Sequence, residues 1–375
     1  MIIKNCRIFN GLKFLEGLND ILIKNNKIIG IGKNIKNIED EEIVNIDGNF
    51  AVPGYIDIHT HGINGIDFST SYNYNTDDLF NFYVSKGTTS VYLTTVTMSL
   101  EDIIKLLKRF SIVNHAVFRG VHLEGPYLNI SKLGAHKKEF VIEPSVSSYK
   151  QVVGKYHDIV KRVTIACELD KNYLLAKYLI KNGVVVSFGH TICNAEDSYK
   201  AFENGYRLST HHFNAMPLMH HRDVSITGTS LLNDNVKCEY IPDFYHVSKE
   251  MLNILFKCKP EDNLIMVTDS ISATCLEDGQ YSLGGLSVSV HNGLVTDKSG
   301  TIAGSSITMA EGVFRMINNG FNKSSVLKSA TSNPANVMSL KNKGFLKEGY
   351  DADINILEKN FKYNYTIFQG KLFNY

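Results

Sequence analysis

Eight short apolar segments run through the middle of this chain, and the stretches between most of them are amphipathic. This alternation constrains the fold more than any other feature, because strands that alternate with helices pair in parallel through right-handed crossovers. Eight such units close into a barrel, so we predict an α/β fold with a (β/α)8 barrel of the TIM type. The predicted strands are Tyr55–His59, Ser90–Thr95, Val117–His122, Val163–Cys167, Val184–Phe188, Tyr206–Thr210, Val236–Ile241 and Leu264–Val267.

Helix start signals between these segments support the alternation. Ser99 begins a capping box ahead of the amphipathic stretch at 103–107. Asn194 and Ser248 each precede a further amphipathic stretch and have side chains that cap helices well.

Both ends of the chain are predicted to form strands, with Asn25-Asn26 as a tight hairpin turn near the start. Neither end has enough strands to be stable alone, so we predict one small β-sandwich module built from both. The expected division is a module of residues 1–50 plus 345–375 and a barrel domain of residues 51–344. The terminal strands are Met1–Phe9, Asp20–Lys24, Lys27–Ile31, Glu42–Asp47, Asp353–Leu357 and Tyr363–Leu372.

Composition narrows the class of protein. A chain of 375 residues is long enough for a barrel of about 250 residues with an attached module. The net charge of +1 argues against a nucleic-acid-binding surface. Six cysteines are scattered without a C-x-x-C pair, which favours reduced thiols over disulfides. The start lacks a signal peptide and no segment has the length of a membrane span, so we expect a cytoplasmic protein with no membrane partner.

Metal-capable side chains follow the predicted strands at their C-terminal ends. In this fold those ends build the active site. A random scatter of thirteen histidines is not expected to collect there. The residues in question are His59 and His61 after the first strand, Glu124 after the third, His190 after the fifth, His211 after the sixth and Asp269 after the eighth.

Each of these residues has an ordinary structural alternative. His59 and His61 point to the same side of an extended chain, although a lone H-x-H arises by chance. A buried Glu124 is costly unless it is paired or binds a metal, but it could instead be a solvated turn residue. His190 could be a hydrogen-bonded core histidine, and Asp269 could be only a helix cap.

Their combination points to a catalytic metal. His211 and His212 are adjacent and point in opposite directions, so only one is expected to reach the ion. Two or three imidazoles, one carboxylate and an open position are typical of a catalytic site for a divalent cation. Asp269, beside a metal-bound water, would be a general base. Zinc suits these ligands, and iron or manganese would also fit.

The motifs as a set resemble the N-acetylglucosamine-6-phosphate deacetylase family of the amidohydrolase superfamily over essentially the whole chain. Some motifs are weak alone, but their order and spacing are specific. They are Pro53–Gly62, His122–Pro126, Gly134–His136, Gly189–Thr191, His211–Met216, Arg222, His246, Thr268-Asp269 and Ala303–Ser305.

The resemblance implies a role for each matching residue. Glu124, His190 and His211 would hold the principal metal, Asp269 would be the general base and later the acid, and His136 would bind the amide carbonyl oxygen. The substrate, an amino-sugar phosphate, would be bound by Ala135, His136, Asn214, Ala215, Arg222, His246, Ile302, Ala303 and Gly304. Within that set, the Asn214-Ala215 backbone, Arg222 and His246 would hold the 6-phosphate. Phosphate ligands from a neighbouring subunit would make the active form a homodimer.

Three features depart from the family pattern. Some members lack the H-x-H pair and use one metal, whereas this chain keeps His59 and His61, so one or two ions per subunit remain open. His212 stands where an apolar residue is expected. Lys137-Lys138 replaces smaller polar residues after the motif histidine.

Three alternatives remain. Dihydroorotases and hydantoinases, also amidohydrolases, place a modified lysine at the end of the fourth strand, where this chain has Ala166–Leu169 without a lysine. A deacetylase of N-acetylgalactosamine-6-phosphate differs only in the orientation of one substrate hydroxyl. A non-catalytic sugar-phosphate-binding protein would be expected to have lost the base or a metal ligand.

Overall fold

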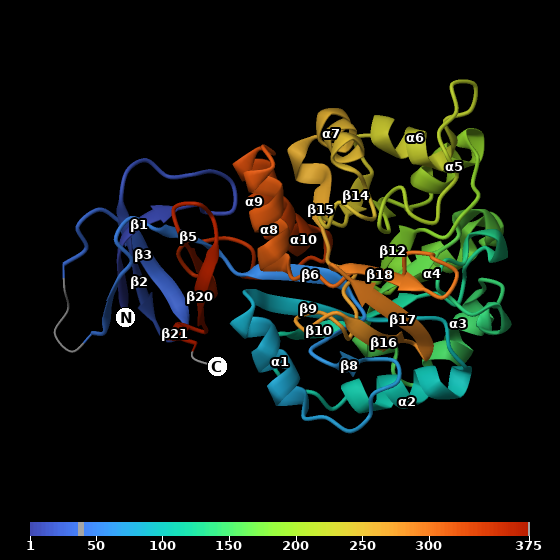
Figure 1. Ribbon diagram of the computed structural model, residues 1–375, viewed down its shortest axis with the longest axis horizontal. Helices are drawn as coiled ribbons and strands as arrows, with labels where there is room; N and C mark the ends of the chain where they lie inside the picture. Colours follow the sequence, from blue (N-terminus) through green and yellow to red (C-terminus); the bar gives the residue numbers. More distant parts are fainter. Residues whose placement is uncertain (37–40, 374–375) are drawn as a thin grey trace. The chain divides into compact units, whose positions relative to one another are not determined.

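The computed structural model describes residues 1–36 and 41–373 (Figure 1). Its internal contacts divide the chain into two compact units. The first comprises Met1–Asp57, Thr76–Ser90 and Met309–Tyr375, and the second comprises Ile58–Asn75 and Val91–Thr308. Among the described residues, no helix combines the length and apolar character needed to cross a membrane.

An eight-stranded sheet in the order β15-β14-β13-β12-β11-β10-β9-β6 forms the barrel. Neighbours from β9 to β15 pair in parallel, and a parallel bridge between Thr60 and Ser270 joins the two ends of the sheet. All eight predicted strands are present, so the predicted (β/α)8 fold is confirmed. They are β6 (Tyr55–Thr60), β9 (Thr88–Thr95), β10 (Phe118–Glu124), β11 (Val160–Ile165), β12 (Val185–Phe188), β13 (Leu208–Ser209), β14 (Lys237–Tyr240) and β15 (Leu264–Met266).

Helices alternate with these strands along the chain. The predicted caps are confirmed, since the side chains of Ser99, Asn194 and Ser248 each accept a hydrogen bond from a backbone N–H in the first turn of the helix that follows. The helices are α1 (Thr76–Ser85), α2 (Leu100–Phe110), α3 (Val146–Val153), α4 (Leu174–Lys181), α5 (Ala195–Glu203), α6 (Ser225–Leu232), α7 (Lys249–Cys258), α8 (Met309–Asn318), α9 (Lys323–Ala330) and α10 (Ser332–Val337).

The two chain ends share one sandwich-like β-module, as predicted, with the strand order β21-β20-β19-β5-β1-β2-β3 and β4 paired to β1. The antiparallel pair β5–β19 joins the early and late segments. Asn25 and Asn26 both take positive φ, which matches the right-handed twist of a two-residue hairpin. The strands are β1 (Ile2–Ile8), β2 (Asn19–Lys24), β3 (Lys27–Gly32), β4 (Ile43–Asn45), β5 (Phe50–Pro53), β19 (Ile354–Leu357), β20 (Tyr363–Phe368) and β21 (Lys371–Leu372).

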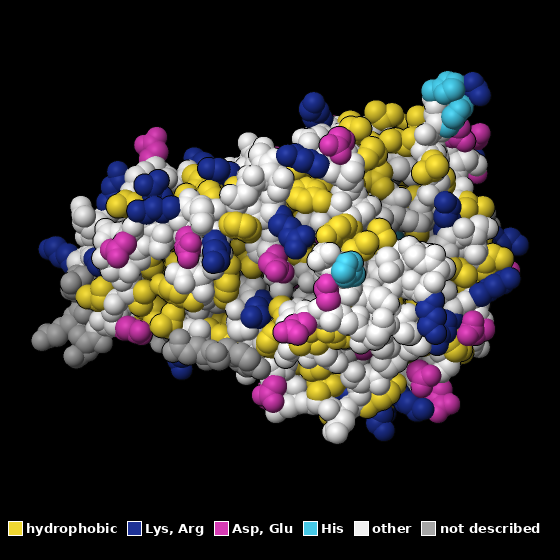
Figure 2. Space-filling model, viewed as in Figure 1, with side chains coloured by type: hydrophobic (Ala, Val, Ile, Leu, Met, Phe, Trp, Pro, Cys, Tyr) yellow, Lys and Arg dark blue, Asp and Glu magenta, His cyan; other side chains and the backbone are white. Residues whose placement is uncertain are grey.

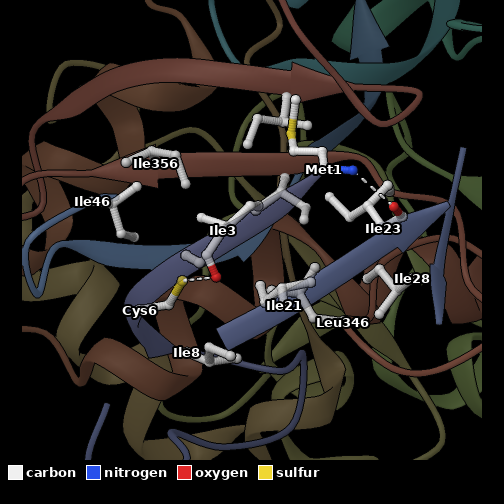
Figure 3. Close-up of a cluster of buried hydrophobic side chains, with 14 residues drawn as sticks. Met1, Ile3, Cys6, Ile8, Ile21, Ile23, Ile28, Ile46, Leu346 and Ile356 are labelled. Carbon is white, nitrogen blue, oxygen red and sulfur yellow. Dashed lines mark hydrogen bonds between the residues drawn. The ribbon is translucent and has the colours of Figure 1, made fainter. Parts of the chain in front are cut away.

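Close packing of aliphatic side chains stabilises this module (Figure 3). Isoleucines from β1, β2, β3, β19 and β20 meet in a cluster that also contains Cys6 and Leu346. The predicted single strand at Tyr363–Leu372 is wrong in one respect, because a turn at Gln369-Gly370 splits it into β20 and β21. Both turn residues have positive φ, which a continuous strand cannot accommodate.

A three-stranded antiparallel sheet after the last barrel strand was not predicted. It consists of β16 (Gly279–Leu283), β17 (Leu286–His291) and β18 (Leu294–Asp297). Its two turns are Gly284-Gly285 and Asn292-Gly293, all at positive φ, which are the dipeptides that two-residue hairpins favour. A smaller antiparallel pair, β7 (Gly62–Ile63) and β8 (Ile66–Asp67), follows the first barrel strand.

Candidate active site

Glu124, the last residue of β10, lies at the C-terminal mouth of the barrel and contacts imidazoles through both of its carboxylate oxygens. Its Oε1 is 2.9 Å from His211 Nε2 and 3.2 Å from His190 Nε2. The two imidazole Nε2 atoms are themselves 3.1 Å apart. We call Glu124, His190 and His211 the first triad.

The second triad consists of His59, His61 and Asp269. Asp269 Oδ1 is 3.1 Å from His61 Nε2 and 3.4 Å from His59 Nε2. Glu124 Oε2 lies 3.1 Å and 3.4 Å from the same two nitrogens, so this carboxylate is shared between the triads. All six residues predicted from strand ends therefore converge on one point.

The donor set of these triads fits a divalent cation. His190 Nδ1 is 2.7 Å from the carbonyl oxygen of Lys132, which can only accept, so Nδ1 carries the proton and a neutral ring presents a bare Nε2. That bare nitrogen faces the Nε2 of His211 at a distance that a shared cation explains. Tetrahedral ligands at about 2.0–2.1 Å from zinc lie about 3.3 Å from one another, close to the observed spacings.

Opposite charges at the mouth shift several pKa values in opposite directions. Burial by itself would raise the pKa of Glu124, but the neighbouring imidazoles outweigh it and hold that pKa well below its usual value. The pKa of Asp269 is lowered for the same reason, against the effect of burial. Burial lowers the pKa of His61, yet Asp269 and Glu124 raise it to about 9. Without a metal, the second triad therefore binds protons tightly.

His136 has the opposite electrostatic character. Its Nδ1 accepts a hydrogen bond from the Thr97 backbone N–H at 3.0 Å, so the proton of the neutral ring lies on Nε2. Burial is the main cause that lowers the pKa of His136 to about 4, which keeps the ring neutral near pH 7. Nε2 lies 3.4 Å from Glu124 Oε2, so the ring directs a neutral N–H donor at the triads.

The backbone is strained at three of the site residues. His190, His211 and Asp269 have φ values of 49°, 29° and 49°, a region that costs a non-glycine residue about 1–3 kcal/mol. At Asp269 the strain is held by two backbone hydrogen bonds, from its N–H to the His59 carbonyl and from Ser305 N–H to its own carbonyl. Such strain is concentrated at functional sites in proteins.

A cavity of about 380 Å³ opens onto the triads, a size suited to a small organic ligand. It lies entirely within the second compact unit. All of the predicted substrate-binding residues except Arg222 line it, as do His61 and Asp269; His59 is fully buried and does not. Lining residues that the sequence analysis missed are Val96, Ser131, Lys132, Leu133, Leu283 and Thr301.

His246 is held by a carboxylate that was also missed. Its Nδ1 is 2.6 Å from Asp243 Oδ2. Burial lowers the pKa of His246, but the hydrogen bond and charge of Asp243 outweigh it and raise the pKa. The contact with Asp243 therefore favours the protonated form of this imidazole, which suits an anionic ligand.

The adjacent pair His211-His212 behaves as predicted, with one ring at the triads and the other directed elsewhere. His212 Nδ1 lies 2.8 Å from Ser209 Oγ, and burial lowers the pKa of His212 to about 3. It is a neutral core residue and does not line the cavity.

Arg222 lies on the loop before α6, which projects from its unit in Figure 1; at the same place Figure 2 shows exposed histidine and basic side chains. Its Nη1 is 2.7 Å from His221 Nε2, and neither residue lines the cavity. Leu218 on the same loop is 88% exposed. The chain thus does not bring this arginine to its own cavity.

Comparison with known proteins agrees with this geometry. The model of the amidohydrolase family matches residues 50–373, a span that contains both triads. The chain belongs to the amidohydrolase family. Among amidohydrolases it is similar to the N-acetylglucosamine-6-phosphate deacetylase of Lysinibacillus sphaericus, at 30% identity over 99% of this chain and 97% of the relative. An N-acetylgalactosamine-6-phosphate deacetylase of Escherichia coli O157:H7 is 28% identical over 87% of this chain and 88% of its own.

Two crystal structures extend the likeness to this amidohydrolase's fold. N-acetylglucosamine-6-phosphate deacetylase from Thermotoga maritima superposes with a TM-score of 0.88 at 31% identity, covering 100% of this chain and 99% of the other. A substituted variant of the Mycobacterium smegmatis deacetylase was solved in complex with N-acetyl-D-glucosamine-6-phosphate. It superposes with a TM-score of 0.93 at 25% identity, covering 100% of this chain and 99% of the other.

Proposed function

We propose that this chain is a metal-dependent deacetylase that hydrolyses N-acetylglucosamine-6-phosphate to glucosamine-6-phosphate and acetate. The observation that carries the proposal is the convergence of Glu124, Asp269, His136 and three triad histidines on one cavity of suitable size. These histidines are His61, His190 and His211. The names of the relatives support the substrate.

The proposed cofactor is zinc, with one or two ions per subunit. The first triad would hold the principal ion, and His59 and His61 would hold a second. Imidazole nitrogens with one or two carboxylates suit zinc, and iron or manganese fits the same donors. When bound, the cation supplies Lewis-acid activation of the amide carbonyl and of water.

The chain's own residues carry the proton transfers. Asp269, ionised because its pKa is lowered, takes a proton from the attacking water as the C–O bond forms. His136 donates its Nε2–H to the carbonyl oxygen as negative charge develops there. Asp269 then gives the proton to the departing nitrogen as the C–N bond breaks, which releases acetate and the free amine.

The 6-phosphate is proposed to bind near His246 and the Asn214-Ala215 backbone. The imidazolium of His246 supplies charge, and Arg222 adds a bidentate guanidinium from the neighbouring subunit of a homodimer. The projecting loop with its exposed Leu218 supports such an exchange between subunits. We place the enzyme in the cytoplasm, where its phosphorylated substrate would be retained.

Acetate release from three sugars tests this function: N-acetylglucosamine-6-phosphate, its galacto epimer and the unphosphorylated N-acetylglucosamine. Chelator-sensitive turnover of the first, with little release from the sugar without phosphate, is expected. Preference for the epimer would keep the mechanism and change the substrate, an alternative that the galacto-acting relative supports. Zinc-loaded protein that releases no acetate from any of them would overturn the proposal.

A further inference from the structure

A buried ion pair lies among the barrel strands and takes no part in the proton transfers described above. Arg162 on β11 and Glu239 on β14 are both fully buried and pair through Nη1 and Oε1. An ion pair without solvent gives little net stability compared with apolar residues of similar size. The ion pair is better explained by the site residues that it holds in position.

The second oxygen of Glu239 connects two histidines of the site. Glu239 Oε2 lies 3.2 Å from His59 Nδ1 and accepts the backbone N–H of His211 at 3.0 Å. An ionised carboxylate only accepts, so His59 Nδ1 must carry the proton. With Nδ1 occupied by that proton, the nitrogen of His59 that can bind a metal is Nε2, which faces Glu124 and Asp269.

Arg162 holds this carboxylate in its ionised form and in place. Its other donors are also satisfied, by Ser187 Oγ at 3.0 Å and by Thr210 Oγ1 at 2.9 Å. The guanidinium is therefore fixed between three strands, and it fixes Glu239.

We infer that Glu239, held by Arg162, is a positioning residue that sets the tautomer of His59 and the backbone of His211 for metal binding. The inference rests on the proposed function, because it concerns the same metal site. Partners that fix a metal-binding histidine through its other ring nitrogen are a general feature of metal sites, and their loss typically costs about 10–100-fold in metal affinity.

Glu239→Gln tests the inference while keeping the side-chain shape. Glutamine has a single side-chain oxygen. That oxygen cannot accept a hydrogen bond from Arg162 and also accept hydrogen bonds from His59 and His211, which lie on the opposite side. If the oxygen pairs with Arg162, the NH2 group faces His59 Nδ1 and opposes the required tautomer. We expect zinc affinity, measured by competition with a chromophoric chelator, to fall about 10–100-fold.

Asp170→Asn is the matched control. Asp170 is another buried carboxylate of the same unit, and it accepts from Leu175 N, Ala176 N and Tyr206 OH rather than from the site. The Asp170→Asn variant should bind zinc with the same affinity as the wild type. Equal affinity in Glu239→Gln as well would overturn the inference.

A double variant, Arg162→Met with Glu239→Leu, removes both charges and leaves His59 Nδ1 without its acceptor, which covers the case in which an unpaired buried guanidinium prevents folding. The inference predicts that this variant still binds zinc about 10–100-fold more weakly than the wild type. Wild-type affinity in the double variant would show that only the unpaired charge mattered, and would overturn the inference. Wild-type protein that binds no zinc would instead overturn the proposed function.

Discussion

The barrel mouth and the core of the β-module are both buried, yet they are built from opposite chemistry. The mouth packs five histidines and two carboxylates within hydrogen-bonding distance, with three of these residues in strained backbone conformations. The module core is aliphatic, built mainly of isoleucine side chains such as Ile3 and Ile356 (Figure 3).

This difference shows that the residues proposed for catalysis and the residues that stabilise the module lie in different parts of the molecule. Isoleucine side chains stabilise by leaving water, each contributing about 1.5–3 kcal/mol when fully buried. The mouth gains no such energy, since charged groups lose hydration there and are stabilised only by one another. Substitutions at the mouth should therefore change turnover more than stability, and substitutions in the module core should do the reverse.

The largest effect is expected from Asp269→Asn. The variant loses the proton acceptor, and turnover should fall by about 10²–10⁴-fold. The principal zinc ion and the melting temperature should be retained, because Glu124, His190 and His211 are unchanged and the amide keeps the side-chain shape. Steady-state kinetics measures turnover, and calorimetry measures zinc binding and the melting temperature. Full activity would refute the role of Asp269.

His136→Leu should show the next largest effect. Loss of the donor that faces the carbonyl oxygen is expected to lower kcat by about 10²–10³-fold. KM should change far less, because the interaction strengthens in the transition state. A variant with unchanged kcat and raised KM would show that His136 only binds the substrate.

The affinity of the metal-free protein for zinc should depend on pH. The pKa of His61 is raised to about 9, so its imidazole carries a proton at pH 7 that the metal must displace. Affinity is therefore expected to fall about tenfold per pH unit, for each displaced proton, as pH decreases from 8 to 6. Calorimetry in buffers of different ionisation enthalpy counts the protons, and a pH-independent affinity would contradict the assignment.

The smallest effect is expected from Ile356→Val in the module core. Ile356 is fully buried, and loss of one methylene there should lower the free energy of unfolding by about 0.5–1.5 kcal/mol. The kcat of the folded enzyme should be unchanged. Denaturant titration measures the stability of the variant, and kinetics on the same sample measures its turnover. A reduced kcat would contradict the expectation that module-core substitutions affect stability alone.

The barrel could be predicted from the sequence because its strands are buried on both faces and appear as continuous apolar runs. The triads could be predicted because their members follow those runs. Glu239 could not, since it lies inside the run Val236–Ile241, and only the strand pairing reveals which way it points. Thr97 could not either, because it contacts His136 Nδ1 through both its backbone N–H and its hydroxyl across a separation of 39 residues.

The arrangement of the cavity wall has an evolutionary consequence. The metal-facing residues come from the ends of barrel strands, whereas Leu283, Thr301 and Ile302 come from the end of β16 and from the segment that follows β18. One contiguous stretch, residues 283–302, thus supplies this part of the wall and contains no member of either triad. Substitutions within that stretch change the shape of the cavity while both triads stay intact, so a new specificity can arise here without passing through an inactive protein.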